Sequence, residues 1–155
     1  MSTLSNWIAA QLAFVLRSCY SADKAYIIHE QPTYCFDDPG QMRRPDVLLV
    51  WAHRLLQGLT HDELHTVPDF AAEVVSPTNT WSGVRDRVED YLKAGVPLVW
   101  VVEPDPRSVH AYRGDGSIAL YRVNDTVRDE PLLPGLSLRV VDLLPAAVQP
   151  PRSGP

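Results

Sequence analysis

Hydrophobic side chains recur at helical spacing in two segments of the chain. The first pattern predicts an amphipathic helix over residues 4–20, and Ser5 can cap its start. The second predicts a helix over residues 83–94, which Gly95 ends. In each helix the apolar residues form one stripe: Trp7, Ile8, Leu12, Val15 and Leu16 in the first, and Val84, Val88, Tyr91 and Leu92 in the second.

Most of the remaining apolar positions fall in short runs that predict β-strands. Residues 25–36 are rich in β-branched and aromatic side chains, but Pro32 makes this segment an interrupted or edge-like strand. Two runs that alternate on either side of Gly114-Asp115-Gly116 predict a hairpin. Continuous apolar runs predict buried strands at 47–51, 70–75 and 98–104, and the two hairpin strands are 108–113 and 117–123.

The order of these elements predicts an α/β fold. A strand, a helix and a strand between residues 70 and 104 imply one parallel crossover, whereas the hairpin adds antiparallel strands. We therefore expect a mixed central β-sheet flanked by helices, in one domain that spans residues 1–144. Residues 37–41 predict a turn, residues 53–69 a connection with two short helical turns, and the proline-rich residues 145–155 a flexible tail.

Composition narrows the class of protein. The 155 residues are 45% apolar and 21% charged, which is typical of one soluble globular domain. The longest apolar run, Val96 to Val102, is much shorter than the about 20 residues that cross a membrane, and no secretory signal is visible, so we expect a cytoplasmic protein without a membrane partner. Cys19 and Cys35 are too few for a disulfide framework and are expected to be half-buried thiols.

The charges bear on the partners that the chain can have. Its net charge of −5 lacks the basic excess that is usual in a sequence-independent nucleic-acid binder. Twelve arginines accompany only two lysines, Lys24 and Lys93, which leaves few candidates for a catalytic lysine. Four arginines are candidate phosphate contacts: Arg43, Arg44, Arg85 and Arg107.

The sequence HDELH at residues 61–65 mimics the pattern of zinc proteases. Its two histidines would share one helical face, but Asp62 stands where the general base must be a glutamate. Thr60 and Glu63 also fit a capping box that opens one short helical turn. We therefore expect His61 and His65 on an exposed turn without a metal ion, and zinc-dependent hydrolysis is the weaker alternative.

Two carboxylates stand in apolar surroundings, Asp46 at the start of one predicted strand and Glu73 inside another. A carboxylate in such a run is costly unless it is paired, protonated or bound to a metal. If the strands are neighbours, the two charges repel each other, and Mg²⁺, which prefers hard oxygen ligands, resolves the repulsion. The ion could then activate water to cleave a phosphate ester. In the alternative reading, Asp46 caps a turn and Glu73 pairs with an arginine.

Five short segments occur along the chain in a fixed order: Arg44-Pro45-Asp46-Val47, Asp69 to Pro77, Tyr91 to Pro97, Val99 to Pro104 and Leu133-Pro134-Gly135-Leu136. None is specific alone. As an ordered set they resemble the Uma-two family of putative restriction endonucleases, within the PD-(D/E)XK nuclease superfamily. The resemblance covers residues 5 to 144.

The resemblance implies a restriction-endonuclease-like fold and an endonuclease that hydrolyses DNA with Mg²⁺ or Mn²⁺. By the same analogy, Asp46 and Glu73 bind the metal ion together with the backbone carbonyl of Val74. The superfamily places a lysine two residues after the glutamate, where this chain has Val75. In this family the lysine moves to the following helix, at the position of Arg87, which is therefore the third catalytic candidate.

Arg87 is the main departure from the family pattern. Arginine stays protonated, so it can stabilise a charged transition state but cannot act as a general base. We expect it to point toward Glu73 and to pair with one or both carboxylates. A second departure is Gly83, where many members have aspartate, and the glutamate that often stands in the family's leading segment has no counterpart.

Two functions follow from these observations. The first is a metal-dependent DNA endonuclease that is impaired because Arg87 replaces the lysine. The alternative is a catalytically inactive nuclease-fold module that binds a partner or nucleic acid. Many nucleases cut as homodimers, and the predicted strand from Tyr26 to Phe36 is a candidate pairing edge.

Overall fold

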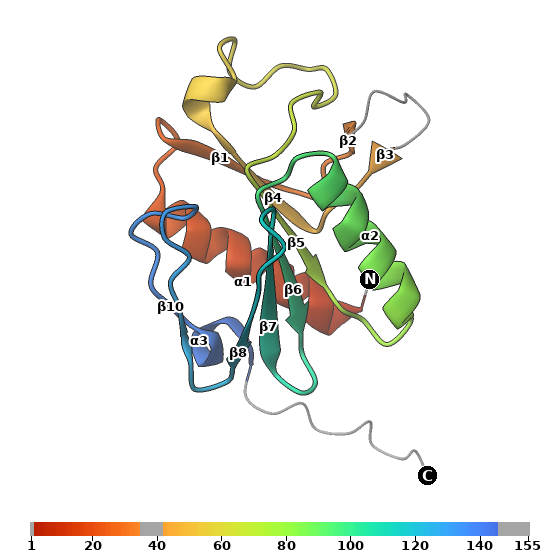
Figure 1. The fold of residues 1–155 in the computed structure, drawn as a ribbon. Helices are drawn as coiled ribbons and strands as arrows, with labels where there is room; N and C mark the ends of the chain where they lie inside the picture. The colour runs from red at the N-terminus through yellow and green to blue at the C-terminus, as the bar shows by residue number, and fades with distance from the viewer. Residues whose placement is uncertain (1, 35–41, 146–155) are drawn as a thin grey trace.

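The computed structural model describes residues 2–34 and 42–145, and Figure 1 shows how helices and strands follow one another along the chain. The helices are α1 (Thr3–Cys19), the 3-10 turn η1 (Ala52–Arg54), α2 (Trp81–Lys93) and α3 (Val140–Leu143). The strands are β1 (Ala25–His29), β2 (Thr33–Tyr34), β3 (Met42–Arg43), β4 (Val47–Trp51), β5 (Phe70–Val74), β6 (Leu98–Glu103), β7 (Ser108–Arg113), β8 (Ile118–Arg122), β9 (Thr126–Val127) and β10 (Leu138–Arg139).

Six strands form one mixed sheet in the order β1-β4-β5-β6-β7-β8. The neighbours β5 and β6 are parallel and are joined through α2, whereas every other neighbouring pair in this sheet is antiparallel. The predicted α/β fold, with one parallel crossover between residues 70 and 104 and a hairpin after it, is therefore confirmed. Two further pairs, β2 with β3 and β9 with β10, are antiparallel as well.

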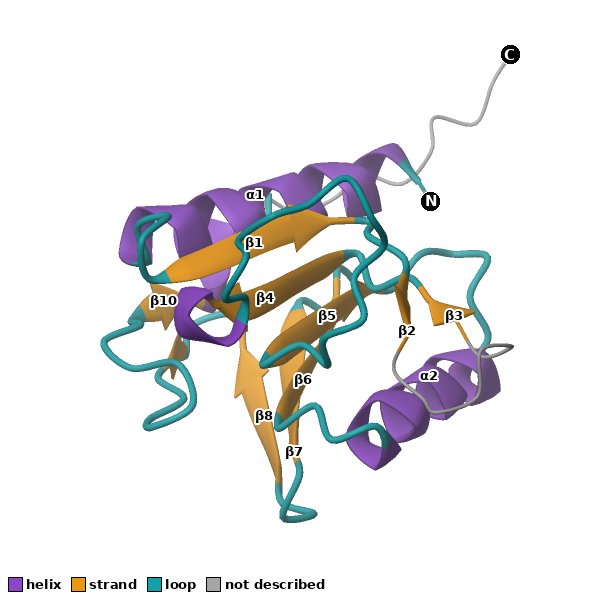
Figure 2. Ribbon diagram, turned by 90° about the horizontal axis from the view of Figure 1, so that it is seen from above, coloured by secondary structure: helices purple, strands orange, loops and turns teal. Residues whose placement is uncertain are grey.

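The two long helices lie on opposite faces of the sheet, α1 above it and α2 below it in Figure 2. Successive side chains of a strand point to opposite faces, so β6 contributes to two hydrophobic cores, one on each face of the sheet. Trp100 and Val102 pack on the α1 side of the sheet, whereas Val99 and Val101 pack on the α2 side. The run Leu98–Glu103 is buried throughout because helices cover both of its faces.

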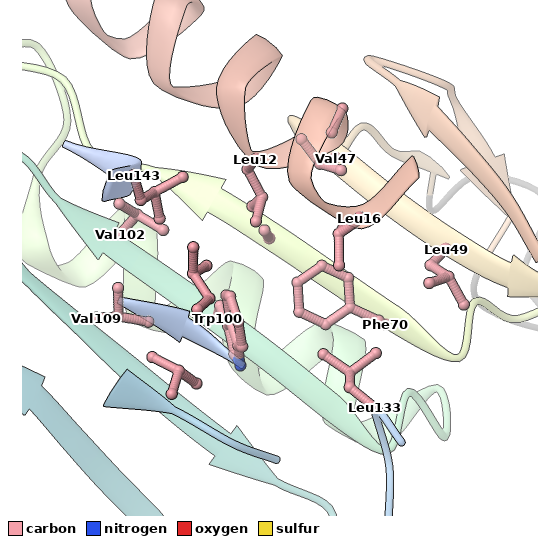
Figure 3. Packing of buried hydrophobic residues seen from close by; sticks show 14 of the residues in the cluster. Leu12, Leu16, Val47, Leu49, Phe70, Trp100, Val102, Val109, Leu133 and Leu143 are labelled. Atoms are coloured by element: carbon pink, nitrogen blue, oxygen red, sulfur yellow. The ribbon is translucent and has the colours of Figure 1, made fainter. Parts of the chain in front are cut away.

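The larger core lies between the sheet and α1. Figure 3 shows Phe70 and Trp100 there. Their rings are arranged edge to face, and the ring centroids are 5.1 Å apart. Leu133 and Leu143, from the C-terminal part of the described chain, pack in the same core. Complete burial of a side chain of this size stabilises the fold by about 1.5–3 kcal/mol. The C-terminal segment is therefore part of the same packed unit as α1.

Both helices begin slightly before the predicted residues. α1 is capped by Ser2 rather than Ser5: the Ser5 amide donates to Ser2 Oγ (3.1 Å), and the Ser2 amide donates to Ser5 Oγ (2.9 Å). This is a capping box, in which Ser5 is the residue three positions into the helix. α2 begins at Trp81 rather than at residue 83, because the Thr80 side chain accepts a hydrogen bond from the Gly83 amide (3.1 Å).

Two predictions about local structure were wrong. The connection at 53–69 was expected to hold two short helical turns, but η1 is its only described helical turn. The Thr60 hydroxyl accepts from the Asp62 amide (3.2 Å), two residues on, which stabilises a bend rather than the start of a helix. Cys19, the last residue of α1, is exposed rather than half-buried.

Some predictions fall outside the described residues: the turn at 37–41, Cys35, Phe36 and nearly all of the tail at 145–155. Within residues 2–34 and 42–145, no helix has the length and apolar character needed to cross a membrane.

Candidate active site

Asp46 stands immediately before β4, and contacts with neighbouring segments hold it in place. Its amide donates to the Ala72 carbonyl of β5 (3.0 Å), and its carbonyl accepts from the Glu30 amide (3.2 Å). Its side chain reaches the end of β5, where Oδ2 accepts from the Val74 amide (2.7 Å). The pairing of β4 with β5 thus brings the Asp46 carboxylate next to the residue that follows Glu73.

Glu73 lies inside β5, on the face of the sheet that α2 covers. Its side chain is only 6% exposed. The Arg87 Nε donates to Glu73 Oε2 (3.0 Å), and the Tyr91 hydroxyl donates to Oε1 (2.7 Å). Residues four apart on a helix lie one above the other, so α2 reaches both oxygens of this buried carboxylate at once.

The two carboxylates influence each other electrostatically. Burial, with the nearby Asp46 as the second cause, raises the pKa of Glu73 to about 7, although Arg87 and the Tyr91 hydroxyl oppose the change. Burial also raises the pKa of Asp46, against the opposing effects of the Val74 amide and Arg87. One guanidinium therefore offsets only part of the cost of two ionised carboxylates at this place. The site favours additional positive charge.

The oxygen atoms of the site suit a hard divalent cation. Asp46 and Glu73 supply carboxylates, and Mg²⁺ commonly binds through one or two of these while it keeps several water molecules. In an extended strand the amide and the carbonyl of one residue point to the same side. Because the Val74 amide points toward Asp46, its carbonyl does so too, which fits its expected role as a third oxygen ligand. No cluster of three or more His, Cys, Asp or Glu side chains suited to a metal occurs in the described residues.

The expected contact between Arg87 and Glu73 is present. The second partner of Glu73 was missed: the sequence placed Tyr91 on the same helical face as Arg87 but only as part of an apolar stripe. The signal was available, since a buried phenol hydroxyl usually needs a hydrogen-bond partner and Glu73 stands in an otherwise apolar strand. The contact between Arg87 and Glu73 also agrees with the alternative interpretation of the sequence, in which Glu73 pairs with an arginine.

The four candidate phosphate contacts differ in their surroundings. Arg43 Nε donates to Asp90 Oδ2 of α2 (2.8 Å), so this arginine is engaged in an ion pair. Arg107 is partly buried and donates to the Pro145 carbonyl (3.2 Å). Arg44 and Arg85 are exposed, which leaves them as the stronger candidates for a phosphate.

The structure does not bring the histidines of HDELH onto one helical face. His61 and His65 are both exposed, and the residues from 61 to 65 form bends and an isolated bridge instead of a helix. Outside a helix, a spacing of four residues does not place the two histidines on one face, as it does in zinc proteases.

Comparisons with known proteins identify the family and the fold of the chain. The family described as "Uma2: Putative restriction endonuclease" matches residues 1–141. A crystal structure of a putative nuclease belonging to DUF820 from Anabaena variabilis ATCC 29413 superposes with a TM-score of 0.82. The two chains are 21% identical, and the match covers 92% of this chain and 81% of the other, which shows that they share the mixed sheet with flanking helices. No curated protein matches the chain significantly.

Proposed function

The chain belongs to the Uma2 family of putative restriction endonucleases, and from this membership we propose that it is a metal-dependent endonuclease that hydrolyses DNA phosphodiester bonds. Asp46, Glu73 and the Val74 carbonyl hold Mg²⁺ or Mn²⁺, and Arg87 is the catalytic cation. The activity is weak because arginine replaces the family lysine.

The observation that carries this proposal is the buried Glu73 carboxylate beside Asp46. A protein seldom places two carboxylates in one partly buried site unless a cation or a proton compensates them. The raised pKa of Glu73, about 7, reflects this incomplete compensation. Sites with these properties are frequently functional.

The residues of the chain would act in distinct ways. Asp46 and Glu73 orient the metal ion, which when bound supplies an activated water and offsets charge on the phosphate. Tyr91 fixes one oxygen of Glu73 through its hydroxyl. Arg87 stays protonated, so it stabilises negative charge on the phosphate rather than accepting a proton from water.

Arg87 also limits the activity. Its guanidinium donates to Glu73 Oε2, an oxygen of the carboxylate that would hold the metal ion. The ion must therefore compete with a charge-assisted hydrogen bond, which is stronger than a neutral one. A lysine at this position is a smaller cation that can release a proton when its pKa falls.

A nicking assay on supercoiled plasmid with Mg²⁺ or Mn²⁺ tests the proposal. We expect weak or undetectable cleavage by the unmodified chain and at least about tenfold faster cleavage by Arg87→Lys, roughly 1.4 kcal/mol of barrier. Glu73→Ala should abolish cleavage. Arg139→Lys is the matched control, because Arg139 is exposed on β10, outside the six-stranded sheet that holds Glu73, and it should leave the rate unchanged. Robust cleavage by the unmodified chain that Glu73→Ala abolishes would show that arginine suffices.

The alternative function is a binding module without catalysis. The ion pair between Arg87 and Glu73 favours it, because this pair already compensates part of the charge that a metal ion would neutralise. Absence of cleavage by both the unmodified chain and Arg87→Lys, combined with a shift of labelled DNA in a gel, would support this function over the endonuclease.

A further inference from the structure

The strand β8 forms an edge of the six-stranded sheet, and its outer side pairs with no strand that the structure describes. The Arg113 amide donates to the Ser117 carbonyl, which identifies this position of the β7–β8 ladder as a hydrogen-bonded pair. Such pairs alternate along an antiparallel ladder. Ala119 therefore directs its amide and carbonyl toward β7, whereas Ile118 and Leu120 direct theirs outward.

The side chains at this edge are apolar and exposed. Ile118 is 62% exposed and Leu120 is 44% exposed. Ile118 lies opposite Tyr112 of β7, and Tyr112 lines a cavity of about 220 Å³ together with Trp81, which is itself 62% exposed. These four residues, Trp81, Tyr112, Ile118 and Leu120, form what we call the β8 patch. Contiguous exposed apolar surface of this kind often marks a binding surface.

The edge lacks the features that usually prevent strand pairing. Exposed edge strands are commonly protected by lysine, proline or an inward-pointing charge, and residues 117–121 contain none of these. Arg122, the last residue of β8, has its outward backbone groups occupied: its amide donates to Asp125 Oδ2, and its carbonyl accepts from the Asp125 amide. The outward groups of Ile118 and Leu120 are thus the ones available for pairing.

The opposite edge of the sheet is different. In β1 the Lys24 carbonyl accepts from the Ala52 amide, so by the same alternation Ile27 directs its carbonyl outward. That carbonyl already accepts a hydrogen bond from the guanidinium of Arg17 on α1 (2.8 Å). The edge from Tyr26 onward, which the sequence suggested for dimerisation, is therefore partly occupied by the chain itself.

We propose that two copies of this chain pair through β8, antiparallel and about a two-fold axis at Ala119. In this register Ile118 of each copy lies opposite Leu120 of the other, and both pairs are of the hydrogen-bonded type. In this register the outward amides and carbonyls of Ile118 and Leu120 pair between the copies. Arg122, whose backbone already bonds to Asp125, takes no part in the pairing. Ala119 faces Ala119 across the axis, where a small side chain fits.

Charge also favours a second copy as the partner. The register places Arg122 of each copy opposite Gly116 of the other, beside Asp115 at the tip of the hairpin. Opposite charges therefore meet at both ends of the paired strands, which favours this arrangement over a shifted one. The proposal does not depend on nuclease activity, because Glu73 contacts α2 through Arg87 and Tyr91, away from β8.

Sedimentation of the full chain, followed over concentration up to about 100 µM, tests the proposal. We expect the unmodified chain to dimerise and Leu120→Lys to weaken dimerisation at least about tenfold. Leu56→Lys is the matched control, because Leu56 is 93% exposed and lies in the connection between β4 and β5, which are not neighbours of β8, and it should dimerise normally. A chain that stays monomeric, or a dimer that Leu120→Lys leaves intact, would overturn the proposal.

Disulfide trapping tests the register and does not require a change of charge. In a background with Cys19→Ser and Cys35→Ser, Ala119→Cys should cross-link to itself, because opposite residues of a non-hydrogen-bonded pair have Cα atoms about 4.5 Å apart. Arg122→Cys is the control, since it lies far from its own copy in this register. Cross-linking of both variants at equal rates, or of neither, would contradict the proposed pairing.

Discussion

Glu73 is a buried carboxylate whose charge the surrounding residues compensate only in part. Its carboxylate is almost completely buried, and neither Arg87 nor Tyr91 restores the pKa to the ordinary value. A folded state that holds an ionised carboxylate in this environment is less stable than one that holds a protonated carboxylate or a metal complex. The residue therefore makes the stability of the chain depend on pH and on cations.

The pH dependence of stability should reveal this residue in metal-free protein. The pKa of Glu73 is about 7 in the folded chain and its ordinary value is 4.5, so the folded chain binds more protons between these values. The resulting stabilisation is complete below about pH 4.5 and is lost as the pH rises through about 7. Across this window we expect the free energy of unfolding to fall by roughly 2–3 kcal/mol on account of Glu73.

Urea unfolding at a series of pH values, with a chelator present, measures this effect. Glu73→Gln should flatten the dependence between about pH 5 and 7. Glu89→Gln is a suitable control, because Glu89 lies on the exposed side of α2 with 54% of its side chain accessible. Parallel curves for the unmodified chain and Glu73→Gln would contradict a raised pKa in the folded state.

Among the elements, α2 does most to define the site. It crosses between the parallel strands β5 and β6, and this connection places Arg87 and Tyr91 over Glu73. The helix begins where the Thr80 side chain accepts from the Gly83 amide. A Cβ at Gly83 would approach Thr80 Oγ1 to 3.0 Å, so the glycine at this position suits the close capping contact.

Removal of the cap should destabilise the fold by a small, measurable amount. Thr80→Ala leaves the Gly83 amide without its side-chain acceptor, and we expect a loss of about 1 kcal/mol in the free energy of unfolding. Thr60→Ala is the control: its hydroxyl also accepts one amide hydrogen bond, but it lies in a bend outside any helix. A loss no larger than that of Thr60→Ala, measured by urea unfolding, would show that the cap contributes little.

Local sequence patterns predicted most of the elements but not their exact ends. The buried strands β4, β5 and β6 were found because short, largely apolar runs between turn residues are typical of buried strands. The start of α1 was assigned to Ser5, since two serines three residues apart can both cap a helix and only the backbone geometry distinguishes them. The segment at 53–69 has helical composition but forms one 3-10 turn, which shows that propensity alone is a weak guide.

At the scale of the whole molecule, strand order depended on information that local patterns do not contain. Nothing in β1 or β4 specifies that they are neighbours, and β10 pairs with β9 across a loop. The family resemblance supplied the arrangement that brings Asp46 to the end of β5. The outward direction of Ile118 and Leu120 could not be predicted either, because it depends on the register between β7 and β8.

The C-terminal part of the described chain is tied to the sheet through Asp129. This residue follows β9, and its side chain is fully buried. Trp100 Nε1 of β6 donates to Asp129 Oδ2 (2.7 Å), and the Arg113 guanidinium of β7 pairs with Oδ1. One carboxylate thus joins two strands of the sheet to the segment that supplies Leu133 to the core.

Asp129→Asn should therefore destabilise the entire fold rather than only its C-terminal segment. The change leaves Arg113 without its anionic partner in a largely buried position, and breaking such a pair costs about 3–5 kcal/mol. Tryptophan fluorescence and circular dichroism during urea unfolding should shift together to lower urea, because the segment and the sheet share one core. Asp125→Asn, at an exposed aspartate whose side chain accepts the Arg122 amide, should cost less than about 1 kcal/mol. Two separate transitions in Asp129→Asn would show instead that the C-terminal segment unfolds independently.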